Sequence, residues 1–441
     1  MMRKYFGTDG IRCKVGEFPL TPDFALKLGF SAGKALAEQH PKATVLIGKD
    51  TRLSGDMFET ALAAGLNYAG VDVLLAGILP TPGIAHLVIK HQFSAGIVVS
   101  ASHNPFYDNG IKFFNEKGEK LDDTLESHIE ALIDMPMTMP DNGSIGRTQY
   151  FVDGVAEYID FCRASADNLD LSGLNIVLDC AHGATYEVAP TLFKRLGANI
   201  ITIGTEPNGT NINDHVGSTA PATLIETVLA KKADCGIAFD GDGDRLLIVD
   251  HQGRPFDGDD ILYLLAIAKK EKRVVGTIMS NLGFEQALKK AGIELLRSKV
   301  GDRYVLEMLN EENLTIGGEN SGHILCLDQH STGDGIIAAL QALLFSQKLG
   351  KSFAEIRDEI PKTVQVMHNV RIEKGALWES DALKQEVAVI DTLLAGKGRI
   401  LIRPSGTEPV VRIMVESSDQ NECEIYVERL KKVLLENMVL A

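Results

Sequence analysis

The sequence lacks any pair of cysteines at the spacing of a zinc or redox site. Its six cysteines are scattered and none has a histidine at ligand spacing, which argues against a zinc site and against a disulfide framework. No uninterrupted apolar run approaches the roughly 18 residues of a membrane span, and the N-terminal segment has no apolar stretch typical of a secretory signal. We therefore expect buried thiols, no membrane partner and a cytoplasmic location. The cysteines are Cys13, Cys162, Cys180, Cys235, Cys326 and Cys423.

Basic runs are also missing. Lys and Arg number 44 against 60 Asp and Glu, which gives a net charge of −16, and no basic cluster marks a surface that follows a phosphate backbone. We expect no nucleic-acid partner. Anionic small molecules can still bind, because a local group of arginines and backbone N–H groups decides such binding and the net charge does not.

The composition that is present is that of a folded protein with several domains. Apolar residues make up 45% and charged residues 24% of the 441 residues, far from the composition of a disordered chain. Short apolar, β-branched runs recur, each followed by a loop rich in Gly, Asp, Ser or Asn, which is typical of α/β architecture. Four such runs are Thr44–Gly48, Gly96–Val99, Asn175–Leu178 and Gly236–Phe239.

Changes of composition along the chain predict four domains. Residues 136–146 mix Pro, Gly, Asn and Met without an apolar period, and a second break falls near residues 252–255. From about residue 361 the pattern shifts toward strands and reads β-α-β-β-α. The prediction is three related α/β domains and a smaller α+β C-terminal domain. The predicted domains are 1–150, 151–252, 253–366 and 367–441.

Three carboxylates lie in one short loop. Asp240, Asp242 and Asp244 alternate with Gly241 and Gly243 between two apolar strands. Residues four apart in an extended chain are roughly 13 Å apart, too far to share one ion, so the loop must curl, and the glycines give it that freedom. This oxygen-rich set suits a hard cation such as Mg²⁺ and leaves coordination positions for phosphate oxygens.

Two other interpretations of this loop have less support. An EF-hand also begins D-x-D-x-D, but Arg245 stands at its sixth position in place of Gly, and His251 at its twelfth in place of Glu. Acidic turn residues in solvent would not require three alternating aspartates. The loop is therefore predicted to bind a divalent cation.

Ser102 and His103 follow the apolar run that ends at Val99, within Ser-Ala-Ser-His-Asn-Pro (100–105). The Asn-Pro pair favours a tight turn that presents the serine toward a cleft. The segment is not a G-x-S-x-G elbow, so acyl hydrolysis by that route has no support. Lys112 lies in the next apolar strand, where a lysine must either face solvent or be functional. Taken alone, its position favours solvent.

Two further loops combine hydrogen-bond donors and acceptors. Residues 317–323, Gly-Gly-Glu-Asn-Ser-Gly-His, offer the groups that polyol recognition requires. Residues 403–409, Arg-Pro-Ser-Gly-Thr-Glu-Pro, with Arg412 just after, suit a phosphate through guanidinium, hydroxyl and backbone N–H groups. Each loop taken alone could equally be a turn. Arg12 follows a glycine-rich turn near the N-terminus, and an ordinary surface arginine is the alternative there.

Together these loops resemble those of the α-D-phosphohexomutase family. The serine loop, the D-G-D-G-D-R loop, the G-E-x-S-G-H loop and the R-x-S-G-T-E-P loop occur in the family's order between residues 100 and 409. Within the family the chain is similar to the bacterial phosphoglucosamine mutases. The segments that carry this similarity are 5–12, 100–105, 300–305 and 319–321. Cys13 departs from the glycine that is frequent after the arginine.

The resemblance implies four domains around a central active-site cleft, each contributing one loop. It also implies interconversion of glucosamine 6-phosphate and glucosamine 1-phosphate through a phosphoserine and a 1,6-bisphosphate, supplying UDP-N-acetylglucosamine for the cell wall. Mg²⁺ is the implied cofactor, glucosamine 1,6-bisphosphate the intermediate and activator, sugar phosphates the partners, and a homodimer a family expectation.

The expected roles follow the matching positions. Ser102 would carry the phosphoryl group and, once phosphorylated, join Asp240, Asp242 and Asp244 as a metal ligand. Lys112 is the first candidate for general acid or base and His103 the second, while Arg245 and Arg12 would serve the reacting phosphoryl group. The expected sugar-binding residues are Glu319, Asn320, Ser321 and His323. The expected ligands of the non-reacting phosphate are Arg403, Ser405, Gly406, Thr407 and Arg412.

Other functions make different predictions. A metal-dependent phosphatase would share the acidic loop but release free phosphate. A non-catalytic sugar-phosphate sensor would keep the loop at Arg403 and lose Ser102 or an aspartate, and none is lost here. A kinase has no support, since no G-x-x-x-x-G-K-[ST] loop occurs. A phosphomannomutase/phosphoglucomutase is the alternative within the family, because an amine and a hydroxyl at C2 differ by one polar group.

Overall fold

The computed structural model describes residues 4–7, 9–138, 141–166, 168–373, 378–404 and 410–437. The chain divides into two compact units. The first comprises Met1–Met279 and Leu296–Arg357, and the second Ser280–Leu295 and Asp358–Ala441. Within the described ranges, no helix has both the length and the apolar character needed to cross a membrane.

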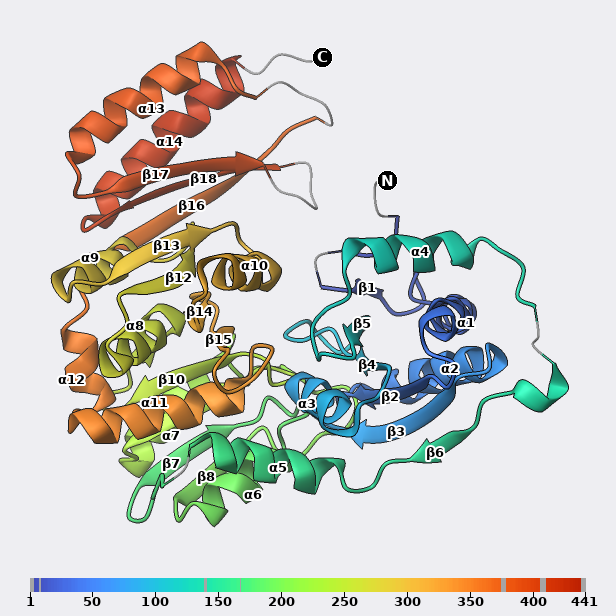
Figure 1. Cartoon of the computed structure of the whole chain (residues 1–441). Helices are drawn as coiled ribbons and strands as arrows, with labels where there is room; N and C mark the ends of the chain where they lie inside the picture. The colour runs from blue at the N-terminus through green and yellow to red at the C-terminus, as the bar shows by residue number, and fades with distance from the viewer. Residues whose placement is uncertain are drawn as a thin grey trace. The chain divides into compact units, whose positions relative to one another are not determined.

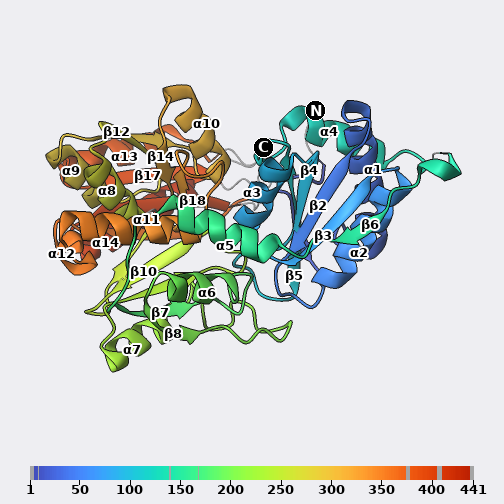
Figure 2. The same cartoon turned by 60° about the horizontal axis from the view of Figure 1, so that its bottom comes forward.

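The first unit begins with a six-stranded sheet of order β1-β5-β4-β2-β3-β6. Its strands are β1 (Ile11–Lys14), β2 (Thr44–Lys49), β3 (Asp72–Ile78), β4 (Ala95–Val99), β5 (Asp108–Asn115) and β6 (Thr148–Tyr150). Its helices are α1 (Pro22–Gln39), α2 (Gly55–Tyr68), α3 (Thr81–His91) and α4 (Asp123–Ile133). Figure 2 shows α3 on the opposite face of the sheet from α1 and α2. With helices on both faces, every residue of β4 is buried.

Helix α1 begins where the local sequence favours a helix start. Thr21 is the N-cap of α1 in an extended conformation, and Pro22 occupies the first turn, where its missing N–H costs no hydrogen bond. Phe24 and Leu28 are buried at helical spacing. The helix packs on α2 and its apolar face joins the main core cluster of this sheet.

Two further sheets contain strands of the first unit. The second has the order β11-β10-β9-β7-β8, with β7 (Asn175–Asp179), β8 (Asn199–Ile203), β9 (Cys235–Phe239), β10 (Leu246–Asp250) and β11 (Pro255–Phe256). The third has the order β13-β12-β14-β15, with β12 (Arg273–Thr277), β13 (Glu294–Ser298), β14 (Ile316–Gly318) and β15 (Ile324–Cys326). Of β13, Leu296–Ser298 belong to the first unit. The helices of this part of the unit are α5 (Gly154–Ser165), α6 (Val188–Arg195), α7 (Ala222–Lys231), α8 (Gly258–Lys269), α10 (Asp302–Glu312), α11 (Gly335–Leu349) and α12 (Phe353–Asp358).

The three sheets share one strand order. Each sheet contains a run of four strands in which the strand that comes first in the sequence lies between the next two, and the fourth is antiparallel to its neighbour. These runs are β3-β2-β4-β5, β8-β7-β9-β10 and β13-β12-β14-β15. The loop before that last strand is the serine loop in the first sheet, the aspartate loop in the second and the 319–323 loop in the third. The prediction of three related α/β domains is confirmed, and each brings one candidate loop to the same topological position.

The second unit contains a three-stranded antiparallel sheet of order β16-β18-β17. Its elements are α9 (Leu282–Lys290), β16 (Val364–Arg371), α13 (Asp381–Leu394), β17 (Arg399–Pro404), β18 (Val410–Ser417) and α14 (Gln420–Asn437). Figure 1 shows α13 and α14 together on one face of this sheet. From β16 onward the order is β-α-β-β-α, so the predicted smaller α+β domain is confirmed. The exact domain boundaries at 150, 252 and 366 stay predictions.

Candidate active site

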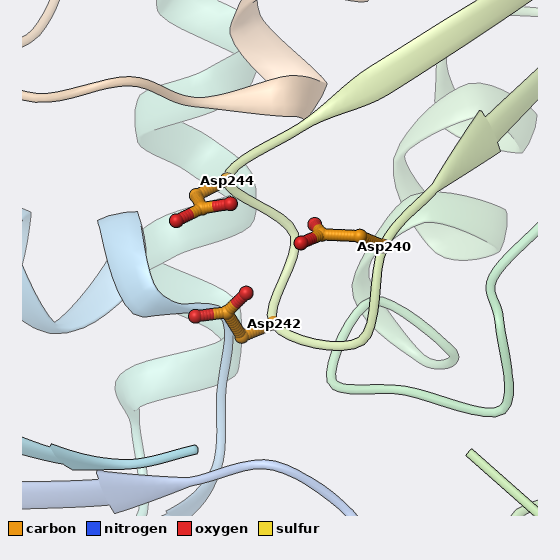
Figure 3. A group of neighbouring side chains, drawn as sticks. All are labelled: Asp240, Asp242 and Asp244. Carbon is orange, nitrogen blue, oxygen red and sulfur yellow. The ribbon is translucent and has the colours of Figure 1, made fainter. Parts of the chain in front are cut away.

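Asp240, Asp242 and Asp244 converge on one point. They lie in the loop that joins β9 and β10, and one oxygen from each lies within 4.8 Å of the others. Figure 3 shows the three carboxylates gathered around the curled loop that carries them. All three residues are buried, so the interpretation as acidic turn residues in solvent is wrong. Gly243 has a φ of 76°, the left-handed conformation that the predicted curl requires.

Two helix N-termini hold this loop. The N–H of Thr81, at the start of α3, donates to the carbonyl of Asp242 at 2.9 Å, and the N–H of Gly335, at the start of α11, donates to the carbonyl of Gly243 at 3.0 Å. The hydroxyl of Thr81 also donates to Asp242 Oδ2 at 2.5 Å. Since a helix N-terminus carries a partial positive charge, these contacts both position the loop and offset its negative charge.

The carboxylates fit a cation. One oxygen on each of Asp242 and Asp244 is buried and has no hydrogen-bond partner among the described residues, which is costly unless a further ligand completes it. Burial and the charges of Asp244 and Asp242 raise the pKa of Asp240 well above its usual value. A bound cation would offset the negative charge that crowds around the buried Asp240 carboxyl group. The loop is therefore able to hold a metal ion.

Ser102 lies directly against this cluster. Its hydroxyl donates to Asp240 Oδ2 at 2.5 Å, although the two residues are 138 positions apart in the sequence. The backbone of Ser102 is left-handed, with a φ of 51°, a strained conformation for a residue with a side chain. Its N–H donates to Ser100 Oγ, whose hydroxyl in turn donates to Asp50 Oδ2. The structure thus brings together the serine and the aspartates that the sequence placed in separate motifs.

Arg52 holds the backbone of the serine loop through hydrogen bonds, and sequence reasoning missed this residue. Its guanidinium is fully buried, pairs with Asp50 at 2.9 Å and donates to the carbonyls of Ser102 and Asn104, both at 2.9 Å. It also donates to the carbonyl of Pro105. A buried charge that satisfies several carbonyls fixes the loop backbone. The available signal was an Asp-x-Arg directly after β2, at the sheet edge where functional loops gather.

Lys112 is buried, so the expectation of solvent exposure is wrong. It lies on β5, next to β4, and its Nζ lies 2.8 Å from Asp242 Oδ2, 3.1 Å from Asp9 Oδ2 and 3.4 Å from Asp244 Oδ2. Burial alone would lower the pKa of Lys112, but the three carboxylates, Asp242 foremost, raise it well above its usual value. The charged lysine is accommodated at this buried strand position because two carboxylates of the aspartate loop and that of Asp9 pair with it.

Arg12, Arg245 and His103 surround the same cluster. Arg12 pairs with Asp9 at 2.8 Å and is three-quarters buried, so an ordinary surface arginine does not describe it. Arg245 Nε lies 3.9 Å from Asp244 Oδ1. His103 Nδ1 lies 3.3 Å from Ser102 Oγ. Burial, and then the charges of Arg245 and Arg12, lower the pKa of His103 to about 4, which leaves its imidazole neutral at pH 7.

The loop after β14 divides into a buried part and an exposed part. Glu319 is buried and accepts a hydrogen bond from the N–H of Gly301 at 3.0 Å, whereas Asn320 and Ser321 are exposed. His323 is buried, with its two ring nitrogens 3.8 Å from Asp244 Oδ2 and 3.7 Å from Asp302 Oδ2. The loop therefore joins the aspartate cluster through His323 and leaves two polar side chains accessible.

A second set of ionic residues was missed by sequence reasoning. Lys120 pairs with Asp302 and, at 2.6 Å, with Asp9. Lys112, then Lys120 and Arg12, hold the pKa of Asp9 well below its usual range against the opposing effect of burial. This chain of charges connects the first sheet to the first residue of α10, Asp302. No local motif marks it, because its members lie more than 100 residues apart.

The expected phosphate ligands belong to the second unit. Arg403 and Arg412 are directly opposite each other on β17 and β18, so two guanidinium groups share one face of the sheet. Burial and the neighbouring charge of Arg412 lower the pKa of Arg403. Two like charges so close together suit an anion. Ser405, Gly406 and Thr407 lie outside the described residues.

Comparison with protein families gives four matches that cover most of the chain. Their descriptions are phosphoglucomutase/phosphomannomutase alpha/beta/alpha domain I, at residues 3–138, domain II, at 149–253, domain III, at 257–364, and the C-terminal domain, at 367–433. A phosphoglucosamine mutase of Cupriavidus pinatubonensis is 53% identical over 98% of this chain and 100% of the relative.

Solved structures share the fold. One described as a putative phosphomannomutase from Thermus thermophilus is 22% identical, with a TM-score of 0.80 over 99% of both chains. An N-acetylphosphoglucosamine mutase of Aspergillus fumigatus, described in complex with GlcNAc-6P and magnesium, is 16% identical, with a TM-score of 0.68 over 98% of this chain and 96% of that one.

Proposed function

Because the chain belongs to the phosphoglucomutase/phosphomannomutase family, we propose that it is a phosphoglucosamine mutase that interconverts glucosamine 6-phosphate and glucosamine 1-phosphate. The product would supply UDP-N-acetylglucosamine and cell-wall synthesis. A cytoplasmic location and a homodimer are part of the same proposal.

One observation carries the proposal. The hydroxyl of Ser102 lies 2.5 Å from a carboxylate of the three-aspartate cluster, which is able to hold a cation. A phosphoserine brings nearly two negative charges and requires a cation beside it. A serine placed against a cluster that is able to hold a cation fits a phosphoryl carrier.

We assign Asp240, Asp242 and Asp244 as the residues that would hold Mg²⁺. When bound, Mg²⁺ would neutralise charge on the phosphoryl oxygens. Arg245, at the rim of the cluster, would orient those oxygens through its guanidinium fork. Arg12 would add a second positive charge on the side of Asp9.

Ser102 would pass its phosphoryl group to the free hydroxyl of the sugar phosphate, forming a 1,6-bisphosphate. The bisphosphate would then turn end for end and return the other phosphoryl group to Ser102. Each transfer moves a proton between the sugar hydroxyl and a protein group. His103 is neutral and lies beside Ser102, within reach of that proton, whereas the carboxylates around Lys112 hold it as an ammonium that does not readily give up its proton. Their individual roles stay predictions.

The sugar and its distal phosphate would bind to the other two loops. Asn320 and Ser321 present exposed amide and hydroxyl groups, and Glu319 a carboxylate oxygen, which suit the hydroxyl and amine groups of the ring. The paired guanidinium groups of Arg403 and Arg412 suit a phosphate. Because the phosphate at either end of the sugar must bind at this position, the site should contact the phosphate and make no contacts with the sugar ring.

The test is a phosphorus NMR time course. The protein is incubated with Mg²⁺, a trace of sugar bisphosphate, and either glucosamine 6-phosphate or glucose 1-phosphate, in parallel with Ser102→Ala. We expect prompt interconversion of the glucosamine phosphates, slower turnover of the glucose phosphate, and a rate for the variant lower by something on the order of 10⁶-fold, the scale seen when a nucleophile is removed.

Other outcomes would contradict the proposal. Accumulation of inorganic phosphate would indicate a phosphatase. Full activity of Ser102→Ala would remove the phosphoserine mechanism. Faster turnover of glucose 1-phosphate than of glucosamine 6-phosphate would favour the phosphomannomutase/phosphoglucomutase alternative.

A further inference from the structure

Asn213 makes contacts that none of the motifs explains. It lies in the connection between β8 and α7, and its amide Nδ2 donates to the carbonyl of Ser102 at 2.9 Å and to the carbonyl of Asn104 at 3.0 Å. These are two of the carbonyls that Arg52 also binds. The serine loop of the first sheet is therefore held by one side chain from its own sheet and by one from the next.

The same amide lies against the aspartate loop (residues 240–245). A Cβ atom added to Gly241 would fall 2.5 Å from the carbonyl oxygen of Ser102 and 2.9 Å from Asn213 Nδ2. Only a glycine fits there. The serine carbonyl, the asparagine amide and the backbone of the aspartate loop thus meet in close contact at Gly241.

The backbone of Asn213 is itself fixed. Its φ is 59°, a left-handed conformation that asparagine tolerates better than most residues, and its N–H donates to the carbonyl of Ala181 at 2.9 Å. Ala181 follows β7, the central parallel strand of the sheet that carries the aspartates. The amide is therefore anchored to the same framework as the metal loop.

Arg52 and Asn213 constrain the serine loop in different ways. Arg52 comes from the segment after β2, in the same sheet as the loop, so it fixes the shape of the loop. Asn213 is anchored to the second sheet, so it fixes where the loop stands relative to the aspartates. The Ser102 hydroxyl depends on that placement, because its partner Asp240 directly follows β9 of the second sheet.

We propose that Asn213 is a positioning residue, which holds the phosphoryl-carrying serine in register with the three-aspartate loop. The inference rests on the proposed role of Ser102. Among its described contacts, Asn213 touches neither the 319–323 loop nor the hydroxyl of Ser102, so it acts through the serine backbone.

The variant Asn213→Gly tests this, because glycine adopts the same φ and removes only the amide. We expect kcat for the glucosamine phosphates to fall on the order of 10²-fold, the effect of a misplacement of about 1 Å, with KM within about threefold of the parent. Asn213→Asp keeps the shape but turns a carboxylate oxygen toward two carbonyls, so its kcat should fall further. Asn313→Gly, an exposed C-cap of α10 with a φ of 52°, is the matched control and should keep the parental kcat.

Two further measurements separate a positioning role from a structural one. Mn²⁺ affinity, measured by electron paramagnetic resonance, should match the parent, since the three aspartates are intact, and the melting temperature should stay close to that of Asn313→Gly. A kcat equal to the parent, or a loss of kcat matched by loss of Mn²⁺ binding and melting temperature, would overturn the proposal.

The proposed function is tested separately. Intact-mass measurement after incubation with a sugar bisphosphate should show one phosphoryl group on the parent and on Asn213→Gly, and none on Ser102→Ala. If the parent carries none, the proposed function fails. If the parent is phosphorylated and Asn213→Gly turns over at the parental rate, only the positioning role fails.

Discussion

The serine loop and the proposed sugar loop (residues 319–323) occupy the same topological position in their sheets, yet different contacts hold them. The serine loop is fixed by side chains from other segments, Arg52 and Asn213, which capture its carbonyls. The proposed sugar loop closes on itself through main-chain hydrogen bonds: the N–H of Glu319 donates to the carbonyl of His323 and the N–H of Gly322 to the carbonyl of Glu319, both at 3.0 Å. Its Ser321 side chain stays exposed.

The difference matches what each loop is proposed to do. A phosphoryl carrier must stand at a fixed distance from a cation, and buried charge-assisted hydrogen bonds give that rigidity. A sugar site that must accept the substrate in two orientations needs accessible, adaptable polar groups. The same loop position therefore serves a rigid role in one sheet and a permissive role in another, and four substitutions test this contrast.

The largest effect is expected for Arg52→Met. Both side chains of the Arg52–Asp50 pair are fully buried, so removal of the guanidinium leaves Asp50 without its counter-charge. We expect the free energy of unfolding to fall by about 3–5 kcal/mol, measured by denaturant unfolding. Arg195→Met removes a solvent-exposed pair with Asp160 and should cost less than about 1 kcal/mol. Equal losses of unfolding free energy in the two variants would contradict the inference that Arg52 holds the serine loop rigidly.

Gly241→Ala should separate the serine from the aspartates. The new methyl group would fall 2.5 Å from the carbonyl oxygen of Ser102, so one of the two loops must move. We expect kcat to fall on the order of 10²-fold in the phosphorus NMR assay. Gly143→Ala is the control, because its added Cβ would come no closer than 3.9 Å to the nearest side-chain atom. Parental activity of Gly241→Ala would show that the close approach is not required.

Thr81→Val should weaken the cation site without altering its ligands. The lost hydroxyl holds Asp242 Oδ2 at 2.5 Å, and partners of metal ligands contribute roughly 10–100-fold to metal affinity. A Mn²⁺ titration should show a shift of this size. Thr60→Val removes a hydroxyl that donates to the backbone carbonyl of Asp56 within α2, and it should leave the titration unchanged. The contrast fails if both variants bind Mn²⁺ like the parent.

The smallest effect is expected for Ser321→Ala. The side chain is exposed and would contribute one hydrogen bond to the sugar, worth about 0.5–1.5 kcal/mol. We expect KM for glucosamine 6-phosphate to rise roughly 2–10-fold, with kcat little changed. A loss of kcat as large as that of Gly241→Ala would show that the sugar loop is as demanding as the serine loop, and would remove the contrast.

Local patterns predicted the parts of the site whose residues are neighbours in the chain. Asp240, Asp242 and Asp244 converge because one curled loop with two glycines carries them, and this could be inferred without a fold. The helix after Thr21 could be inferred likewise, because a proline in the first turn and an apolar period are properties of adjacent residues. The resemblance of the four loops to one family added their order and their functions.

Long-range partners were beyond the reach of such patterns. The position of Lys112 on an apolar strand favoured solvent, and only the packing of β5 against the metal loop made it a buried charge with three carboxylates. Arg52 and Thr81 were not identified, because their partners in the site are distant in the sequence. Arg52 binds Ser102, 50 positions away, and Thr81 binds Asp242, 161 positions away.

The sequence alone determined which groups are available: a serine, three alternating aspartates and the polar loops that follow β14 and β17. The tertiary structure decided what each group meets. It brought the hydroxyl of Ser102 into a hydrogen bond with Asp240, 138 residues away, and the amide of Asn213 into a hydrogen bond with the carbonyl of Ser102. The physical reason is that a motif fixes backbone geometry over a few residues, whereas burial, ion pairing and loop register depend on surfaces that exist only after the sheets have packed.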